Sequence, residues 1–585
     1  AEIVRIAAGN PLFLEQLLAF VQEAGPSALG AVPPTIEALL AGRLERLDPD
    51  ERALTERAAV AGRDFSRGGL IALSPPEDLA GLDSRLRTLV RRGLVRALRG
   101  GDDDTYRFHH VLVRDVAYAG TTKDARAELH ERFGTWLEQR GRAADEIVGY
   151  HLEQAHRYRK ELDPGNPGVL GLAKRAGRVL AAAGVGAWTR TDARAAANLL
   201  GRAVSLLPAG EPRRAQVVCE LGLSLGQLGD SAAADAAFTE AIDEATAAGD
   251  HASAAWARIE LARAQMHRGG DPDDLVALAK EAMPLFEEAG NERALARTWR
   301  AIGDARGSMQ GRCADWLDAS EHALAYYRRS GWSSSGCLGD IGSALYFGPT
   351  PVPEALERCD HLLEGATDRP GRAHVLAYLA GLHAYDERGD EALRLLDEAD
   401  NIYGDLRDDY SPANTSGRIR GRVHVLAENH EAAQAAFRAC CETFERFDDS
   451  AALASVAAEL GGSLSAQGRI EEAREWSALA ERRAPAGDVT AQLSWRILKA
   501  RLLAHDNRLV DAEPLAMEAL SLVMQTDALT HQGDVLLDVA TVLAAAKRPG
   551  EAADRVRQAI DAYDRKQNVA AARNARARLA AAKVV

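Results

Sequence analysis

Small and apolar residues recur at fixed offsets along most of the chain, from about residue 170 onward. In AELGGSLSAQGRIEEAREWSALAERRAP, the small residue Gly461 is followed by Ala473 and then by Ala480. Apolar positions that recur every three or four residues mark one face of a helix. The pattern predicts two helices packed face to face. Four pairs between the paired helices are predicted to be tight C-terminal caps of the first helix: Gly229-Asp230, Gly389-Asp390, Asn429-His430 and Gly468-Arg469.

The same arrangement of small and apolar residues recurs with a regular period of about 40 residues, as expected of a repeat architecture. Each copy is anchored by a Gly or Ala on the first helix of a pair, at positions 184, 222, 262, 303, 342, 380, 421, 461, 500 and 540. A small anchor lets the second helix approach closely, and the large residue beside it fills the gap to the next pair. We therefore predict an all-α-dominated fold with about ten helical hairpins over residues 169–562 and one capping helix over residues 563–585.

These offsets resemble those of the tetratricopeptide repeat family. The resemblance implies a superhelical solenoid whose concave groove holds a peptide, a protein or a small ligand. The usual repeat has about 34 residues, so the longer period implies longer helices or loops. Positions that flank each anchor on the first helix are expected to face the groove, and they include Trp256, Arg263, Arg297, Arg300, Arg418, Arg422 and Arg501.

The arginines in this set favour one class of partner. A guanidinium group pairs bidentately with carboxylate or phosphate, so the line of arginines predicts a protein or peptide ligand that is acidic or phosphorylated. The alternative is that the same arginines are solvated or form salt bridges within the superhelix.

Residues 48–120 carry a different pattern. Three helices are expected, in DPDERALTERAAVAG, FSRGGLIALS and DLAGLDSRLRTLVRRG, and the first begins with an Asp-Pro cap. Two short strands follow, LVRALR and TYRFHH, joined by the polar turn GGDDD. Three helices followed by a strand hairpin predict a winged helix over residues 48–120, with connecting helices over residues 121–168.

The third helix and the first strand of this region are rich in arginine, which would suit DNA in an isolated winged helix. An acidic turn at Asp102, Asp103 and Asp104 would repel the phosphate backbone, so docking on neighbouring domains is the preferred interpretation. The next segment, YRFHHVLVRDVAYAG, places His110, Arg114 and Tyr118 along one helix stripe, where packing and capping are expected.

Composition narrows the functional classes. A net charge of −15 argues against bulk nucleic-acid binding, although a local basic patch remains compatible with it. The chain shows no apolar run of about 20 residues and no leader, so we expect no membrane contact and a cytoplasmic location. The six cysteines lack metal-ligand spacing and are expected to be small buried hydrophobic residues; we predict no metal site.

The order of motifs adds a second resemblance. G-N-P-L-F-L-E at residues 9–15, then V-P-P-T-I-E-A-L-L-A-G-R-L-E-R-L at residues 32–47, precede the predicted winged helix and the repeats. This order resembles the C-terminal part of bacterial signal-transducing ATPases with numerous domains, of the type linked to class III adenylate or guanylate cyclases or to LuxR-like regulators. The resemblance implies that residues 1–47 are a remnant of a helical ATPase lid and that an ATPase module precedes them. It also places Gly9, Asn10 and Pro11 at the adenine side of the nucleotide site.

The chain itself contains no G-x-x-x-x-G-K-[ST] motif and no nucleophile–base constellation. We therefore expect no enzymatic activity and no cofactor in this chain, with ATP or ADP bound only when the upstream module is present. The preferred function is a regulatory and sensing region that binds a partner in the groove and signals through the winged helix to the upstream ATPase domain. A DNA-binding regulator and a passive assembly scaffold are the alternatives, and oligomerisation on activation is left open.

Overall fold

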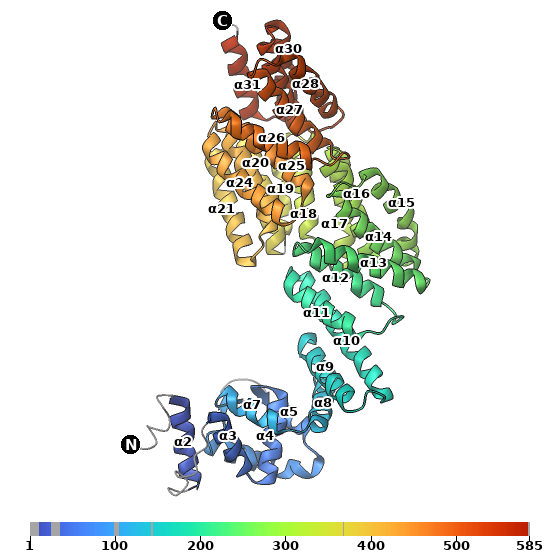
Figure 1. Cartoon of the computed structure of the whole chain (residues 1–585), viewed down its shortest axis with the longest axis vertical. Coiled ribbons are helices and arrows are strands. Elements are labelled where there is room, and N and C mark those ends of the chain that lie inside the picture. Colours follow the sequence, from blue (N-terminus) through green and yellow to red (C-terminus); the bar gives the residue numbers. More distant parts are fainter. Residues whose placement is uncertain (1–10, 25–34, 99–103, 142–143, 367, 583–585) are drawn as a thin grey trace. The chain divides into compact units, whose positions relative to one another are not determined.

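The computed structural model describes residues 11–24, 35–98, 104–141, 144–366 and 368–582 (Figure 1). It divides into two compact units, the first formed by residues 1–186 and 195–214 and the second by residues 187–194 and 215–585. Helices dominate both units, and the strands of the described residues are three short segments in the first unit. The predicted all-α-dominated fold class is confirmed.

The first unit begins with helices α2 (Pro11–Ala24), α3 (Ile36–Glu45) and α4 (Pro49–Ala61). Strand β1 (Asp64–Ser66), helix α5 (Arg67–Leu73), a 3-10 turn (Pro76–Gly81), helix α6 (Leu82–Arg91) and strands β2 (Val95–Leu98) and β3 (Thr105–Phe108) follow. The three strands form an antiparallel sheet in the order β1-β3-β2. The predicted β2–β3 hairpin is present.

Strand β1 lies where the sequence predicts the start of a helix. Phe65 is buried at 3% exposure and pairs with Tyr106 of β3, so its backbone completes the sheet. The helix begins only at Arg67, and the Ser66 side chain caps it by accepting a hydrogen bond from the Gly69 amide. The helix prediction for Phe65 and Ser66 is therefore wrong, because sheet pairing outweighs local helix preference there.

The rest of the first unit is helical: α7 (Val111–Gly120), α8 (Lys123–Arg140), α9 (Asp145–Leu162), α10 (Pro167–Thr189, whose last residues belong to the second unit) and α11 (Ala193–Leu206). His110 caps α7 by accepting a hydrogen bond from the Leu112 amide. The Arg114 Nε donates to the Ala59 carbonyl on α4, so the predicted roles of capping and packing are confirmed for these two residues.

The second unit is a stack of helix pairs (Figure 1, green to red). Its helices are α12 (Arg214–Gln227), α13 (Ser231–Ala247), α14 (His251–Met266), α15 (Pro272–Glu288), α16 (Glu292–Asp304), α17 (Cys313–Ser330), α18 (Ser335–Phe347), α19 (Val352–Gly365), α20 (Arg369–Tyr385), α21 (Gly389–Leu406), α22 (Tyr410–Asn414), α23 (Ser416–Leu426), α24 (His430–Arg446), α25 (Ser450–Ala466), α26 (Ile470–Arg483), α27 (Val489–His505), α28 (Leu509–Val523), α29 (Leu529–Ala545), α30 (Pro549–Lys566) and α31 (Val569–Ala582). A π-helical turn (Ala305–Met309) extends α16. The short α22 is an insertion, and α31 follows the last pair as a single helix, whereas residues 563–566 of the predicted capping segment belong to α30.

The pairing agrees with the predicted repeat. From α10–α11 to α29–α30, the described residues form about ten hairpins. A Cβ atom placed on the anchor Gly222 would lie 2.7 Å from the Phe238 ring, and one on Gly421 would lie 2.4 Å from the Phe437 ring. The two phenylalanines occupy the same place in the second helices of their hairpins, and each packs directly on the glycine backbone.

The predicted turns between paired helices are correct at two of four sites. Gly229 and Gly468 adopt left-handed backbone conformations, with φ of 83° and 75°. At the other two sites the left-handed residue is Glu387 or Glu428, which precedes the predicted Gly389-Asp390 or Asn429-His430 pair. Asn429 instead caps the following helix by accepting a hydrogen bond from the Ala432 amide, as asparagine commonly does at a helix start.

Candidate ligand groove

A continuous cavity of about 1300 Å³ runs through the second unit. First helices of successive hairpins, among them α14, α16, α18 and α23, supply much of its lining. Of the predicted groove residues, Arg263, Arg297, Arg300 and Arg418 line this cavity. Trp256, Arg422 and Arg501 lie on the same class of helix but are not among its lining residues. We call this cavity the groove.

Every predicted groove arginine pairs with a carboxylate on a first helix of a neighbouring hairpin. The Arg263 Nε donates to Asp304 at 3.0 Å, and the Arg297 Nη2 donates to Glu260 at 2.6 Å. The partners lie about one repeat away along the chain, and the full set comprises Arg263–Asp304, Arg297–Glu260, Arg300–Asp340, Arg418–Glu459, Arg422–Glu459 and Arg501–Asp538. We call this set the arginine–carboxylate ladder; it ties successive hairpins together along the groove side.

The acidic members of the ladder were not singled out from the sequence, although the sequence contains their signal. Acidic residues stand two positions before the anchors at 222, 262, 342, 461 and 540, namely Glu220, Glu260, Asp340, Glu459 and Asp538. Four of them belong to the ladder, and Glu220 pairs with Arg293. The recurrence of a carboxylate at one repeat position, next to arginines at others, is the pattern that predicts pairing between repeats.

Glu459 takes part in two ion pairs of the ladder; we call each such group of paired side chains a rung. Its carboxylate accepts from the Arg418 Nη2 at 3.1 Å and also pairs with Arg422. Burial by itself raises the pKa of Glu459, but the two guanidinium charges outweigh it and lower the pKa to about 2. Arg422 also contacts the Nε2 of His531 at 3.1 Å, and burial with these cations lowers the pKa of His531 to about 3. The neutral imidazole therefore accepts this hydrogen bond.

A second charged rung surrounds Asp304. Its Oδ2 lies 3.0 Å from the Arg263 Nε and 3.1 Å from the His267 Nε2. Burial by itself lowers the pKa of His267, but the Asp304 charge outweighs it and raises the pKa to about 9. His267 is therefore a cation at neutral pH. Two cations share one carboxylate, so this rung presents positive charge to the groove.

The Trp256 indole lies in the core behind the groove. It is 5% exposed, and its Nε1 donates to the Glu260 Oε1 at 3.0 Å. This bond orients the carboxylate that Arg297 engages. In the structure, Trp256 supports a rung of the ladder from behind.

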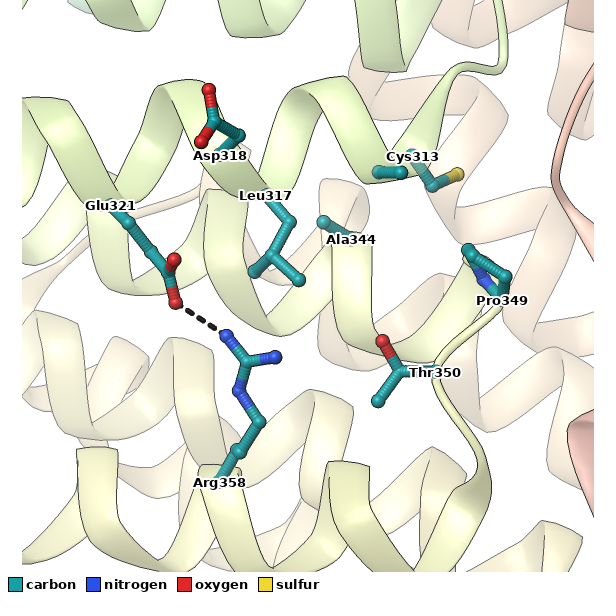
Figure 2. Close-up of a pocket in the computed structure, with 9 residues that line it drawn as sticks. Cys313, Leu317, Asp318, Glu321, Ala344, Pro349, Thr350 and Arg358 are labelled. Atoms are coloured by element: carbon teal, nitrogen blue, oxygen red, sulfur yellow. Dashed lines mark hydrogen bonds and ion pairs between the residues drawn. The ribbon is translucent and has the colours of Figure 1, made fainter.

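A smaller cavity of about 180 Å³ lies beside the start of α17 (Figure 2). Its lining includes Cys313, Leu317 and Thr350, and an ion pair between Arg358 and Glu321 spans one side. Burial raises the pKa of the Cys313 thiol, so the thiol is protonated and unreactive. All six cysteines are buried and free, as predicted.

The predicted nucleotide-side residues lie at the edge of the described chain. Gly9 and Asn10 fall outside the described residues, and Pro11 is the exposed first residue of α2. Helix α2 packs through Leu17 and Phe20 against Leu39 of α3. Across the described ranges there is no group of His, Cys, Asp and Glu suited to a metal ion, and no helix there is long and apolar enough to cross a bilayer.

Comparisons with known proteins give matches among solved structures only. No protein family matches the chain, and no curated protein does. The chain is 13% identical to a Rap protein complexed with competence and sporulation factor, over 64% of this chain and 100% of that one, with a TM-score of 0.44. It is also 13% identical to the APC/C hetero-tetramer Cut9–Hcn1, over 76% and 88% of the two chains, with a TM-score of 0.46.

A third similar structure is a signal transduction ATPase with numerous domains and a tetratricopeptide repeat sensor, from Pyrococcus horikoshii. The identity is 14%, the match covers 96% of this chain and 69% of that one, and the TM-score is 0.27.

Proposed function

We propose that the second unit is a ligand-binding module that holds a protein or peptide segment in the groove. The observation that carries this proposal is the groove itself, a continuous cavity of about 1300 Å³ walled by charged first helices. A cavity of this size suits a segment of several residues better than a single metabolite. Repeat solenoids use such concave surfaces for recognition.

The ladder favours ligands rich in hydrogen-bond acceptors. An arginine has five N–H donors, and Arg263 donates one of them, its Nε–H, to Asp304. Donors that the ladder does not use are available to ligand carbonyl, carboxylate or phosphate oxygens. The positive rung of Arg263 and His267 adds a preference for acidic or phosphorylated segments.

A titration with labelled peptides tests this proposal. The probes are a fluorescein-labelled peptide of alternating Glu and Ser, its phosphoserine form, and a Lys-Ser peptide as the negative probe. We expect the first two to raise fluorescence anisotropy and the third to leave it unchanged. Removing three groove arginines should weaken binding roughly tenfold or more; the variant is Arg263→Gln with Arg300→Gln and Arg418→Gln.

A matched triple variant at second helices provides the control: Arg394→Gln, Arg508→Gln and Arg557→Gln. These arginines are exposed and form ion pairs with carboxylates that do not line the groove, so the control removes the same charge from outside the groove. Equal loss of binding in both triple variants, or no binding of any probe to the parent chain, would contradict a groove site.

We further propose that the chain is the regulatory part of a signal-transducing ATPase and does not hydrolyse ATP itself. The motif order of residues 9–47 and the winged-helix-like arrangement of α4, α5, α6 and the three strands support this. For the test, the chain is expressed together with the coding sequence that lies upstream of it in the genome. ATP hydrolysis by that longer protein should change when residues 215–585 are deleted, and an unchanged rate would remove the sensing role.

DNA binding by the first unit remains a second candidate, for one specific reason. Arg87 and Arg91 on α6 and Arg96 on β2 are exposed, where a winged helix would contact a duplex. Gel-shift titration of the full chain at low salt decides this, with Arg87→Gln plus Arg91→Gln as the comparison. A shift that this variant abolishes supports the candidate, and the absence of any shift removes it.

A further inference from the structure

Turns of the second unit that are far apart in sequence contact each other in a regular series. Phe447 packs on Gly229, Pro272 packs on Gly487, and Thr526 packs on Gly311. In each case the two partners stand between five and six repeats apart along the chain. A turn within a hairpin meets a turn between hairpins, so consecutive superhelical turns of the solenoid touch. We call this line of turn-to-turn contacts the seam.

The early contacts of the seam are chiefly van der Waals. A Cβ atom on Gly487 would lie 2.6 Å from the Pro272 ring, so the two turns meet with no space for a side chain. One backbone hydrogen bond accompanies them, from the Ala451 amide to the His267 carbonyl at 3.3 Å. These contacts depend chiefly on shape, and the charge on His267 also interacts with Asp449 and Asp488 in the facing turns.

The next contact is polar. Asp527, in the turn between α28 and α29, accepts hydrogen bonds from the amides of Cys313 at 2.6 Å and Ala314 at 2.9 Å. These amides begin α17, so that helix is capped by a residue from a distant hairpin. The Asp527 amide in turn donates to the Gly311 carbonyl at 3.3 Å. A carboxylate at a helix N-terminus is favoured by both the free amides and the helix dipole.

The following contact is a buried ammonium group. Lys566, the last residue of α30, has 0% exposure, and its Nζ donates to the carbonyls of Leu345 at 2.6 Å, Gly348 at 2.8 Å and Thr350 at 2.7 Å. An ammonium group has three N–H donors, and all three are used here. Burial lowers the pKa of Lys566 to about 7, so the set of three bonds is complete only in the protonated form. Two of these carbonyls belong to the end of α18, where helix carbonyls lack intrahelical partners. Lys566 therefore links the end of α30 to the end of α18 in a distant hairpin.

Residues next to the polar contacts of the seam form part of the groove wall. Gly311, Cys313, Phe347, Ala528 and His531 line the groove, and they come from the two sides of the seam. The Phe347 and His531 rings meet across it with centroids 5.1 Å apart. Opening the seam at Asp527 and Lys566 would therefore widen the groove directly.

We propose that Asp527 and Lys566 form a clasp that holds the solenoid closed, and that the solenoid opens at this clasp to admit a macromolecular ligand. The first part stands on the seam alone. The second part rests on the proposed ligand-binding function of the groove. Each clasp residue binds backbone atoms of the opposite turn, so replacing it removes the contact without leaving an unpaired partner side chain.

Hydrogen exchange of the full chain, without ligand, tests the clasp. The variants are Lys566→Met and Asp527→Ala, and the matched controls are Lys547→Met and Asp554→Ala, which alter exposed residues nearby. We expect roughly tenfold faster exchange in residues 311–350 and 526–582 of the clasp variants, with residues 215–300 and both controls unchanged. Unchanged exchange at the seam, or acceleration spread evenly over the whole unit, would overturn the clasp.

A milder variant covers the case in which Lys566→Met does not fold. Arg573 and Asn574 of α31 extend the same side of the seam through an ion pair to Glu387 and a hydrogen bond to the Leu426 carbonyl. Arg573→Ala with Asn574→Ala removes partly exposed contacts only, and we expect a smaller acceleration confined to α31 and the turns it touches. Acceleration elsewhere, or none, contradicts the seam.

The ligand arm uses the Glu-Ser peptide in stopped-flow binding. Clasp variants should bind it with a faster association rate than the parent chain and the controls. An unchanged association rate, together with faster exchange at the seam, overturns gated entry. If no protein binds the peptide, the proposed groove function fails instead, and the exchange result still decides the clasp.

Discussion

Two buried histidine sites, one in each unit, have opposite electrostatic settings. In the first unit, His130 and His151 face each other with their Nδ1 atoms 2.8 Å apart, and burial lowers their pKa values to about 2 and about 4. In the second unit, His267 lies beside Asp304, which raises its pKa to about 9. One pair is neutral at pH 7 and the other histidine is a cation. The first interior is thus a neutral network, whereas the second carries compensated charge beside a cavity.

The neutral network is a continuous chain of hydrogen bonds. Tyr158 accepts from Arg157 at 2.9 Å and from Arg126 at 3.4 Å, and its hydroxyl lies 3.1 Å from the Tyr118 hydroxyl. The Tyr118 hydroxyl lies 2.8 Å from the His130 Nε2. A single proton lies between the Nδ1 atoms of His130 and His151. The chain joins α7, α8 and α9 without any net charge among its four members.

Acidification should produce the largest effect. Unfolded histidines take up protons below about pH 6.5, but His130 and His151 in the folded unit do not. The free energy of unfolding of the first unit is therefore retained above pH 6.5 and falls as the pH is lowered, by on the order of 5 kcal/mol down to pH 4. Urea titrations monitored by hydrogen exchange in α8 and α9 measure this. The pH slope should flatten in His151→Leu; an unaltered slope would assign the loss to other groups.

Removing the Glu459 charge should be next in size. Glu459→Gln leaves Arg418 and Arg422 without their countercharge in a mostly buried rung, which costs about 3 kcal/mol of unfolding free energy. Urea unfolding of the second unit measures it. A change below about 0.5 kcal/mol, the size of an exposed pair, would show that water already screens the rung.

Raising the pH should remove the contribution of His267 to the stability of the second unit. Because its folded pKa is raised, His267 contributes stability that is fully present below pH 6.5 and is lost as the pH rises through 9. With the imidazole about 30% exposed, we expect a loss of about 2 kcal/mol. Burial lowers the pKa of Lys566 in the same unit to about 7, which makes the unit more stable as the pH rises, so the loss is measured in urea titrations as the difference between the parent chain and His267→Gln. An equal loss of unfolding free energy in the first unit over this pH range would contradict the difference between the two histidine sites.

The smallest effect is expected at the outer surface. Arg394 is 60% exposed and pairs with Glu391 on the same helix, so Arg394→Gln should change the unfolding free energy by less than about 0.5 kcal/mol. Urea unfolding beside Glu459→Gln gives the comparison. A larger loss would mean that ion pairs outside the groove share the energetic importance of the ladder.

Local patterns made the hairpins predictable. The anchors Gly222 and Gly421, with a phenylalanine at the matching place in each second helix, give both the helix pairing and the contact that fixes it. For the ladder, the sequence predicts the arginines on the groove side. Its carboxylates, which recur two positions before anchors, carry an equally regular signal that the prediction did not include. Strand β1 has three residues, too few for a two-residue alternation to be visible in the sequence.

The seam could not be predicted in this way. Contacts such as Lys566 with the Thr350 carbonyl depend on the rotation between successive hairpins, accumulated over all the hairpins that separate the two residues. Small differences in each hairpin packing angle decide which turns meet, and no single repeat contains that information. From the sequence alone, Lys566 is therefore expected to be an ordinary basic residue at the end of a helix.

The most direct test of the groove as a ligand site is the hydrogen-exchange footprint of the bound Glu-Ser peptide on the full chain. We expect protection of α14, α16 and α23, whose arginines line the groove, and no protection of α15, α19 and α24, second helices that supply none of its lining. Protection confined to the second helices, or to the first unit, would contradict it.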